Sequence, residues 1–155
     1  MPKKDIRKKK GIGIYARPFY IFDEQLPSGL SDALRVARSR VKIAHVGKRQ
    51  DGFEFVARKG TEDTDLLRTG GILFTRDPEF KRANRHPNRD TCVVILQGRG
   101  DSVPGLLALI APLVRMIERS RWVYHLMLGR RFLLSHSSMT EIDEQGRRIQ
   151  SFDIK

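Results

Sequence analysis

Residues 70–77, with the sequence GGILFTRD, contain the segment that decides the fold. The two glycines can end a preceding helix, and the run Ile72–Thr75 predicts a short buried strand. The strand ends at Arg76 and Asp77, so that a charged pair follows directly on apolar residues. A short apolar run bounded by turn residues is typical of a strand that is buried on both faces.

Three further apolar runs have the same character. They predict strands at Phe19–Phe22, Val41–Val46 and Cys92–Leu96. Helical patterns lie between and after them. One begins near Pro27 and Ser28, and the clearest is capped by Ser102 and has apolar residues at helical spacing from Val103 to Ile117. Strands that alternate with helices predict an α/β domain built around a mostly parallel sheet.

The C-terminal part of the sequence predicts hairpin strands. The apolar segment 122–128, the turn Gly129-Arg130 and the run 131–136 are typical of two strands joined by a tight turn. A second, polar hairpin is expected in residues 139–154, around Gln145-Gly146.

The charge of the chain favours an anionic partner. The 155 residues include 30 Lys or Arg and 18 Asp or Glu, which gives a formal net charge of +12 and a pI of about 10.4. Residues 1–10 are predicted to form a flexible basic arm, followed by the main domain at 11–137 and an extension at 138–155. The arm contributes +5, so the remaining residues still carry +7. Nucleic acid is the leading candidate partner, and a generally basic surface is the alternative.

Several protein classes are excluded by composition. One Cys rules out a disulfide framework, and four scattered His add no set of soft-metal ligands. The longest uncharged apolar stretch, Val103–Val114, has 12 residues, fewer than the roughly 17 to 25 that span a bilayer. Arg17 and Pro18 interrupt the chain before a signal-peptide core can form. We therefore expect a cytoplasmic protein without a membrane span.

Three acidic residues occupy comparable positions. Asp23 and Asp77 each follow a predicted strand, and Asp63 begins a predicted helix between them. Residues just past the carboxyl ends of neighbouring parallel strands converge in one crevice. Carboxylate oxygens are the ligands that Mg²⁺ and Mn²⁺ prefer, so these acids are candidates for a shared metal site.

Two alternatives to this interpretation stay open. An acid after a strand can simply cap the next helix or form a turn. Other acids are also close enough in sequence to replace the preferred three, namely Glu24, Glu62, Asp65 and Glu79.

Four segments together resemble a known family. They are FDEQLPSGLSDAL at 22–34, VKIAHV at 41–46, EDTDLLRTGGILFTRDPEF at 62–80 and CVVILQG at 92–98, followed by a Leu-rich helix. In order and spacing they resemble the short, toxin-type branch of the PIN-like ribonuclease superfamily, over about Tyr15 to His136. The resemblance implies a three-layer, PIN-like (Rossmann-like) fold. It also implies an acidic pocket that binds Mg²⁺ or Mn²⁺ and hydrolyses RNA phosphodiester bonds.

The resemblance assigns roles to individual residues. Asp23, Asp63 and Asp77 are the expected metal ligands and catalytic residues. The basic residues around the last acid are expected to bind single-stranded RNA; they are Arg76, Lys81, Arg82, Arg85 and Arg89. Gln25 stands where the branch usually has Asn, and Glu79 where it often has Asp.

The resemblance also implies partners. Members of this branch often serve as the toxin of a toxin–antitoxin pair, so a small DNA-binding antitoxin protein is expected, and a homodimer is a further possibility. The alternative function is a basic nucleic-acid-binding or partner-binding module of the same fold that performs no chemistry.

Overall fold

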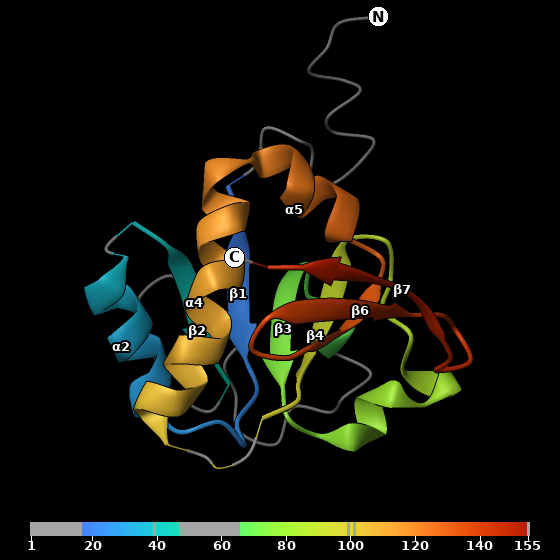
Figure 1. Cartoon of the computed structure of the whole chain (residues 1–155), viewed down its shortest axis with the longest axis horizontal. Coiled ribbons are helices and arrows are strands. Elements are labelled where there is room, and N and C mark those ends of the chain that lie inside the picture. The colour runs from blue at the N-terminus through green and yellow to red at the C-terminus, as the bar shows by residue number, and fades with distance from the viewer. Residues whose placement is uncertain (1–16, 39, 47–65, 99, 101, 155) are drawn as a thin grey trace, which may run out of the picture.

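A seven-stranded sheet forms the centre of the protein (Figure 1). The computed structural model describes residues 17–38, 40–46, 66–98, 100 and 102–154. The strands are β1 (Phe19–Phe22), β2 (Lys42–His45), β3 (Gly71–Thr75), β4 (Thr91–Leu96), β5 (Arg131–Leu134), β6 (Ser138–Ile142) and β7 (Arg148–Asp153). Their order is β2-β1-β3-β4-β5-β6-β7; the first five are parallel, and β6 and β7 are antiparallel. The prediction of an α/β domain with a mostly parallel sheet is confirmed.

Helices connect the parallel strands. They are α2 (Gly29–Ala37), α4 (Val103–Arg119) and α5 (Arg121–Met127), with two 3₁₀ turns, η1 (Pro78–Lys81) and η2 (Ala83–Arg85). The Ser102 hydroxyl caps α4 as predicted, because it accepts a hydrogen bond from the backbone N–H of Gly105 at 3.2 Å. Among the described residues, no helix has both the length and the apolar character needed to cross a membrane.

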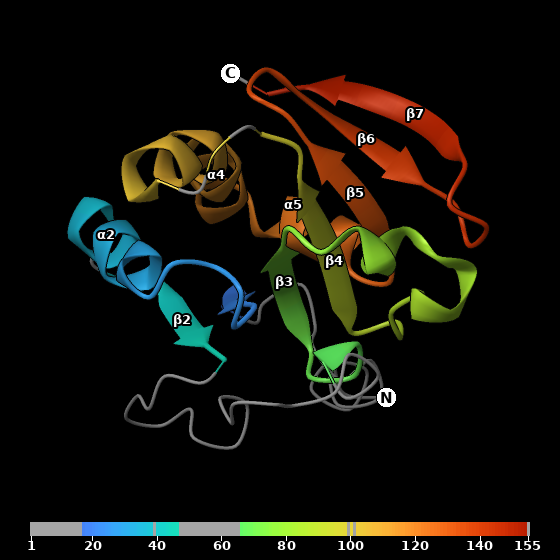
Figure 2. The same ribbon diagram turned by 90° about the horizontal axis from the view of Figure 1, so that it is seen from below.

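Each face of the sheet contributes to a separate hydrophobic cluster. Alternate side chains such as Tyr20, Phe22 and Phe74 pack on the face that α2, α4 and α5 cover (Figures 1 and 2). The opposite face contains Ile21 and its neighbours, and there Leu66, Leu67 and Phe80 cover the strands. Because both faces are buried, the central strands are continuous apolar runs, which is why the sequence predicts them so closely.

Gly71 allows β1 and β3 to approach each other. Its φ is +95°, and a Cβ atom placed on it would lie 2.6 Å from the backbone oxygen of Phe19. Any other residue would therefore combine an unfavourable backbone conformation with a clash against a neighbouring strand. The GGILFTRD segment thus contributes both a buried strand and the glycine that brings it next to β1.

The prediction of a strand at 122–128 is wrong, because residues 122–127 belong to α5 and Leu128 is its C-cap. Tyr124 and Met127, three residues apart, are buried, while Trp122 is 61% and Leu126 is 49% exposed. This is a helical pattern, whereas a strand would bury alternate residues. The tertiary reason is that β5 runs parallel to β4, so the chain must cross over the sheet through α4 and α5.

The predicted polar hairpin near Gln145-Gly146 is confirmed as β6 and β7. The turn closes with a hydrogen bond from the N–H of Asp143 to the oxygen of Arg147 at 2.8 Å. Gly146 adopts a φ of +85°, and a Cβ atom there would lie 2.6 Å from the oxygen of Lys81. The hairpin turn therefore packs closely against η1.

Candidate functional site

The strand order places the carboxyl ends of β1 and β3 side by side. The chain passes from β1 outward to β2 and then returns to β3 on the other side of β1. A reversal of this kind is a topological switch point, where open α/β sheets bind their ligands. The register aligns Phe22 with His45 in β2 and with Phe74 in β3. The next residues, Asp23 and Thr75, consequently lie next to each other at this edge.

A single hydroxyl group links two of the predicted site residues. Thr75 Oγ1 donates a hydrogen bond to Asp23 Oδ2 at 2.7 Å, and it accepts one from the backbone N–H of Asp77 at 3.0 Å. The backbone N–H of Asp23 donates to the oxygen of Phe74 at 3.0 Å. Asp23 is only 5% exposed and Thr75 is fully buried. The Asp23 carboxylate and the backbone of Asp77 are therefore joined through one hydroxyl at the sheet edge.

Asp77 also has a local structural role. Its Oδ1 atom accepts a hydrogen bond from the backbone N–H of Glu79 at 2.9 Å, so that Asp77 is the N-cap of η1. The alternative interpretation from the sequence, an acid that caps the following helix, is thus realised at this position. The cap fixes how the half-buried carboxylate is oriented relative to β3.

His45 is a buried member of this edge that the sequence did not assign to the site. It ends β2, is 2% exposed, and its Nε2 lies 3.1 Å from the backbone oxygen of Leu26. Because a carbonyl oxygen only accepts, Nε2 carries the hydrogen. The imidazole also lies edge-on to Phe22, with ring centroids 6.0 Å apart. His45 therefore holds the turn that follows Asp23. A histidine at the end of an otherwise apolar strand was the available sequence signal.

Arg76 contacts the loop after β4. Its Nη2 donates to the oxygen of Gly98 at 2.8 Å, and its Nη1 donates to the oxygen of Gly100. These bonds tie the ends of β3 and β4 together at the same edge as Asp23. Arg76, which was expected to bind RNA, thus lies at the same edge of the sheet as Asp23.

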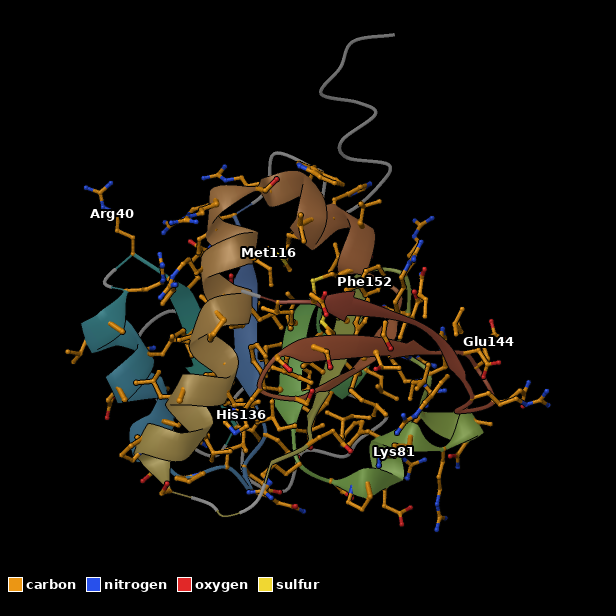
Figure 3. All side chains as sticks on the ribbon, in the orientation of Figure 1. Arg40, Lys81, Met116, His136, Glu144 and Phe152 are labelled. Atoms are coloured by element: carbon orange, nitrogen blue, oxygen red, sulfur yellow. The ribbon has the colours of Figure 1, made fainter. Side chains whose placement is uncertain are left out.

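The other expected RNA-binding residues lie along a connection that leaves this edge. Residues 78–90 return across the sheet toward the start of β4, where the N–H of Asn88 donates to the oxygen of Leu67 at 3.1 Å. Lys81 lies near the β6–β7 turn, which contains Glu144. It is on the opposite side of the molecule from Arg40 (Figure 3). Lys81 and Arg82 thus lie within one 3₁₀ turn of Asp77, and Arg85 and Arg89 lie further along the connection.

The basic residues along this connection differ in exposure and in contacts. Arg82 is exposed, with its Nε 3.0 Å from Glu79 Oε2. Arg89 is exposed and its backbone lies beside Gly129, while Arg85 is half-buried in η2. Exposed cations at these positions can meet a long polyanion at several points.

The third predicted ligand, Asp63, lies outside the described residues, as do Glu62 and Asp65. Within the part of the chain that the structure describes, no group of three or more His, Cys, Asp or Glu side chains is arranged to hold a metal ion. Of the four acids named as alternatives, Glu24 is exposed after β1, and Glu79 pairs with Arg82.

The chain was compared with protein-family models, with curated proteins and with solved structures, and none of the three comparisons found a match.

Proposed function

We propose that this protein is a metal-dependent endoribonuclease of three-layer PIN-like fold that hydrolyses RNA phosphodiester bonds. The observation that carries the proposal is the Thr75 hydroxyl, which bonds to the Asp23 carboxylate and to the backbone of Asp77 at the switch point of a parallel sheet. The resemblance of the sequence to PIN-like ribonucleases supplies the reaction class.

The two carboxylates at this edge are of the type that a hard divalent cation prefers. Carboxylate oxygens suit Mg²⁺ and Mn²⁺, and a 5% exposed carboxylate such as Asp23 benefits from a nearby cation. Asp23 and Asp77 would hold the ion, with Asp63 as the third ligand that the sequence suggests. A bound ion would supply a water nucleophile of lowered pKa and would stabilise charge on the phosphate.

The protein's own residues hold these carboxylates in place before substrate binds. Thr75 orients Asp23, and the bond from His45 to the Leu26 oxygen holds the turn behind it. The cap on η1 orients Asp77. Groups fixed in this way need little reorganisation during the reaction, which is the main contribution a protein makes to electrostatic catalysis.

The decisive experiment measures cleavage of a single-stranded RNA with Mn²⁺ or Mg²⁺ and with a chelator. Asp77→Asn is the test variant, because Asn caps a helix as well as Asp does and the fold should be kept. We expect cleavage to fall by more than about 100-fold. Asp153→Asn, an exposed acid in β7, is the matched control. Unchanged cleavage in Asp77→Asn would show that the assignment is wrong.

A second measurement, of thermal stability, tests the metal site without an assay of cleavage. A cation that binds only the folded state raises the unfolding temperature. Mn²⁺ should therefore stabilise the wild-type protein and the Asp153→Asn control, and this stabilisation should be much smaller in Asp23→Asn. Equal stabilisation of all three proteins would place the ion elsewhere.

We extend the proposal to a cytoplasmic toxin that a small DNA-binding antitoxin silences. A groove of about 370 Å³ between α5 and the β6–β7 hairpin supports a protein partner, since its lining includes the exposed Trp122, Leu126 and Phe152. Co-purification with the product of a co-transcribed neighbouring gene, lost on Trp122→Asp, would support this role. The exposed strand β7 is the corresponding surface for a homodimer, which the molar mass in solution would reveal.

The second candidate function is a nucleic-acid-binding module without chemistry. It is favoured by one observation, which is that the side chains of Asp23 and Asp77 both make structural hydrogen bonds. This function predicts salt-sensitive RNA or DNA binding that is indifferent to a chelator and to Asp77→Asn. The cleavage experiment therefore separates the two candidates.

A further inference from the structure

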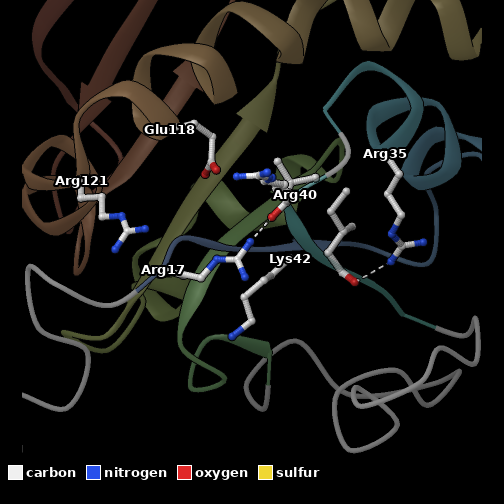
Figure 4. Close-up of a pocket in the computed structure, with 8 residues that line it drawn as sticks. Arg17, Arg35, Arg40, Lys42, Glu118 and Arg121 are labelled. Carbon is white, nitrogen blue, oxygen red and sulfur yellow. Dashed lines mark hydrogen bonds between the residues drawn. The ribbon is translucent and has the colours of Figure 1, made fainter.

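A surface cavity of about 600 Å³ lies at the amino edge of the sheet, at the opposite end of β1 from Asp23. Its walls come from the segment before β1, the end of α2, the start of β2 and the junction of α4 with α5. Figure 4 shows the charged side chains that surround it, which are Arg17, Arg35, Arg40, Lys42, Glu118 and Arg121.

Two of these arginines are held in place by backbone carbonyl groups. Arg17 Nη2 donates to the oxygen of Arg40, and Arg35 Nη2 donates to the oxygen of Ile43 at 2.8 Å (Figure 4). A carbonyl group is neutral, so these bonds orient the guanidinium groups without cancelling their charge. Arg35 also lies 3.7 Å from Asp32, in a partly exposed pair that solvent weakens. Two of the cations that line the cavity are thus preoriented.

Positive charge exceeds negative charge in the cavity. Glu118 is the one acid among the described residues that line it, and its Oε2 accepts a hydrogen bond from the buried Tyr20 hydroxyl at 2.8 Å. The C-terminal ends of α2 and α4 add about half a negative charge each, which helps to explain why basic residues gather here. Five described Lys or Arg side chains, set against Glu118, Asp32 and the two helix ends, still leave an excess of about two positive charges.

We propose that this cavity binds the phosphate backbone of single-stranded RNA. Arg40, Lys42 and Arg121 are exposed, so a chain that passes over the surface can reach all three. Arginine forks match the oxygens of a phosphate group, and each contact releases counterions. Within the part of the chain that the structure describes, only Val41 and Ile43 add apolar lining, so an apolar small molecule fits poorly.

The cavity lies about 20 Å from Asp23, estimated from the rise along β1 and its flanking residues. It would therefore hold RNA at a distance from the bond that is cut. The choice of RNA rests on the proposed function, whereas binding of phosphate groups follows from the cavity alone. The test is accordingly designed to separate the two.

The experiment measures binding of a fluorescent single-stranded RNA of about 12 nucleotides to the full chain in EDTA at several salt concentrations. The test variant is Arg40→Gln/Lys42→Gln/Arg121→Gln. If each of these side chains contacts one phosphate, the slope of log K against log salt should become shallower by about 2, and affinity at about 0.1 M salt should fall about 100-fold.

The matched control removes the same charge from exposed positions elsewhere, as Arg115→Gln/Arg147→Gln/Arg148→Gln. Its affinity should change by less than about threefold, because long-range effects are screened by salt. Residues 1–10 are present in both variants and contribute equally. Circular dichroism establishes that both variants are folded. Equal losses in the two variants, or no loss in the first, would overturn the inference.

Two further probes identify the ligand chemistry. Inorganic pyrophosphate should compete weakly, and a polyglutamate peptide should compete less well than RNA of equal charge. Full competition by pyrophosphate would assign the cavity to a small phosphate compound, and full competition by polyglutamate would assign it to an acidic protein; either outcome overturns the RNA proposal. Binding without cleavage by the wild-type protein would refute the nuclease and leave this inference standing.

Discussion

Arg131 offers the sharpest test of how the parts of this molecule are joined. It is the first residue of β5, and its side chain is fully buried. Nη1 donates to the oxygens of Phe80 and Arg82 at 2.8 and 2.6 Å, and Nη2 donates to the oxygen of Asp143 at 2.6 Å. One guanidinium therefore joins the connection after β3 and the β6–β7 turn to the sheet. Burial lowers the pKa of Arg131, opposed by the nearby charge of Asp143.

Arg131→Met keeps most of the side-chain volume and removes the donors. A hydrogen bond that involves a charged group contributes about 1.5 to 3 kcal/mol, and each carbonyl left without a partner adds a cost. Relief of the buried charge offsets part of this loss, so we expect a net destabilisation of about 3 to 5 kcal/mol. A domain of ordinary stability has about 5 to 15 kcal/mol in total.

The assay is urea unfolding followed by far-ultraviolet circular dichroism. With a slope of about 2 kcal/mol per molar urea, the midpoint should fall by about 2 M. The matched control is Arg130→Met, because the adjacent Arg130 is half-exposed and pairs only with Glu141, at 3.3 Å, in the contacts described for its side chain. Glu141 is buried but keeps its hydrogen bond from Gln150 Nε2 at 2.8 Å, so Arg130→Met should cost about 1 to 2 kcal/mol. If both variants lose the same stability, Arg131 does not join these segments as argued.

Three further predictions concern stability. Gly71→Ala should destabilise the fold by at least about 2 kcal/mol, because it adds strain at positive φ and a clash with the Phe19 oxygen; Gly100→Ala, with a φ of +82° and open space around it, should cost clearly less in the same urea assay. Burial raises the pKa of Tyr124 to about 12, so the folded state retains the phenol proton. The resulting stability is present below about pH 10 and is lost as pH rises toward 12, and Tyr124→Phe should flatten this dependence. Burial, reinforced by a neighbouring guanidinium, lowers the pKa of His86, so stability should fall as pH drops below about 6.5. Unfolding of His86→Asn between about pH 7 and pH 5 checks this, since a slope as steep as that of the wild-type protein would contradict it.

The predicted strands match the structure most closely where both faces are buried. At β1, β3 and β4 the burial requirement forces continuous apolar sequence, which leaves a clear local signal. The prediction of a strand at 122–128 failed because its local signal is ambiguous. A short apolar run fits a strand or a buried helix equally well, and only the parallel partner of β5 requires a helix there.

Part of the candidate site was also predictable. Asp23 and Asp77 follow strands that are neighbours in the sheet, and Thr75 Oγ1 bonds to the carboxylate of Asp23 and to the backbone N–H of Asp77; that the two carboxylates share a metal stays a prediction. Thr75 and His45 were not predicted, because a threonine or histidine at a strand end has many ordinary uses. The course of residues 78–90 depends on where the chain must return to begin β4, and nothing local in the sequence specifies that path.

The basic cavity, too, was only partly predictable from the sequence. Residues 35–42 contain four Lys or Arg, which is visible in the sequence as a local cluster. Arg17 and Arg121 join that cluster only because β1 pairs with β2 and because α4 ends above this edge of the sheet.

By itself, the sequence determined which segments are buried, where strands end, and that acids follow two of those ends, because these properties depend on local patterns of apolar and polar residues. The tertiary structure alone decided which ends meet. Strand order and the crossover connections place Asp23 beside Asp77 at one edge of the sheet and gather distant arginines at the other, since contacts between remote residues follow from how the whole sheet is assembled.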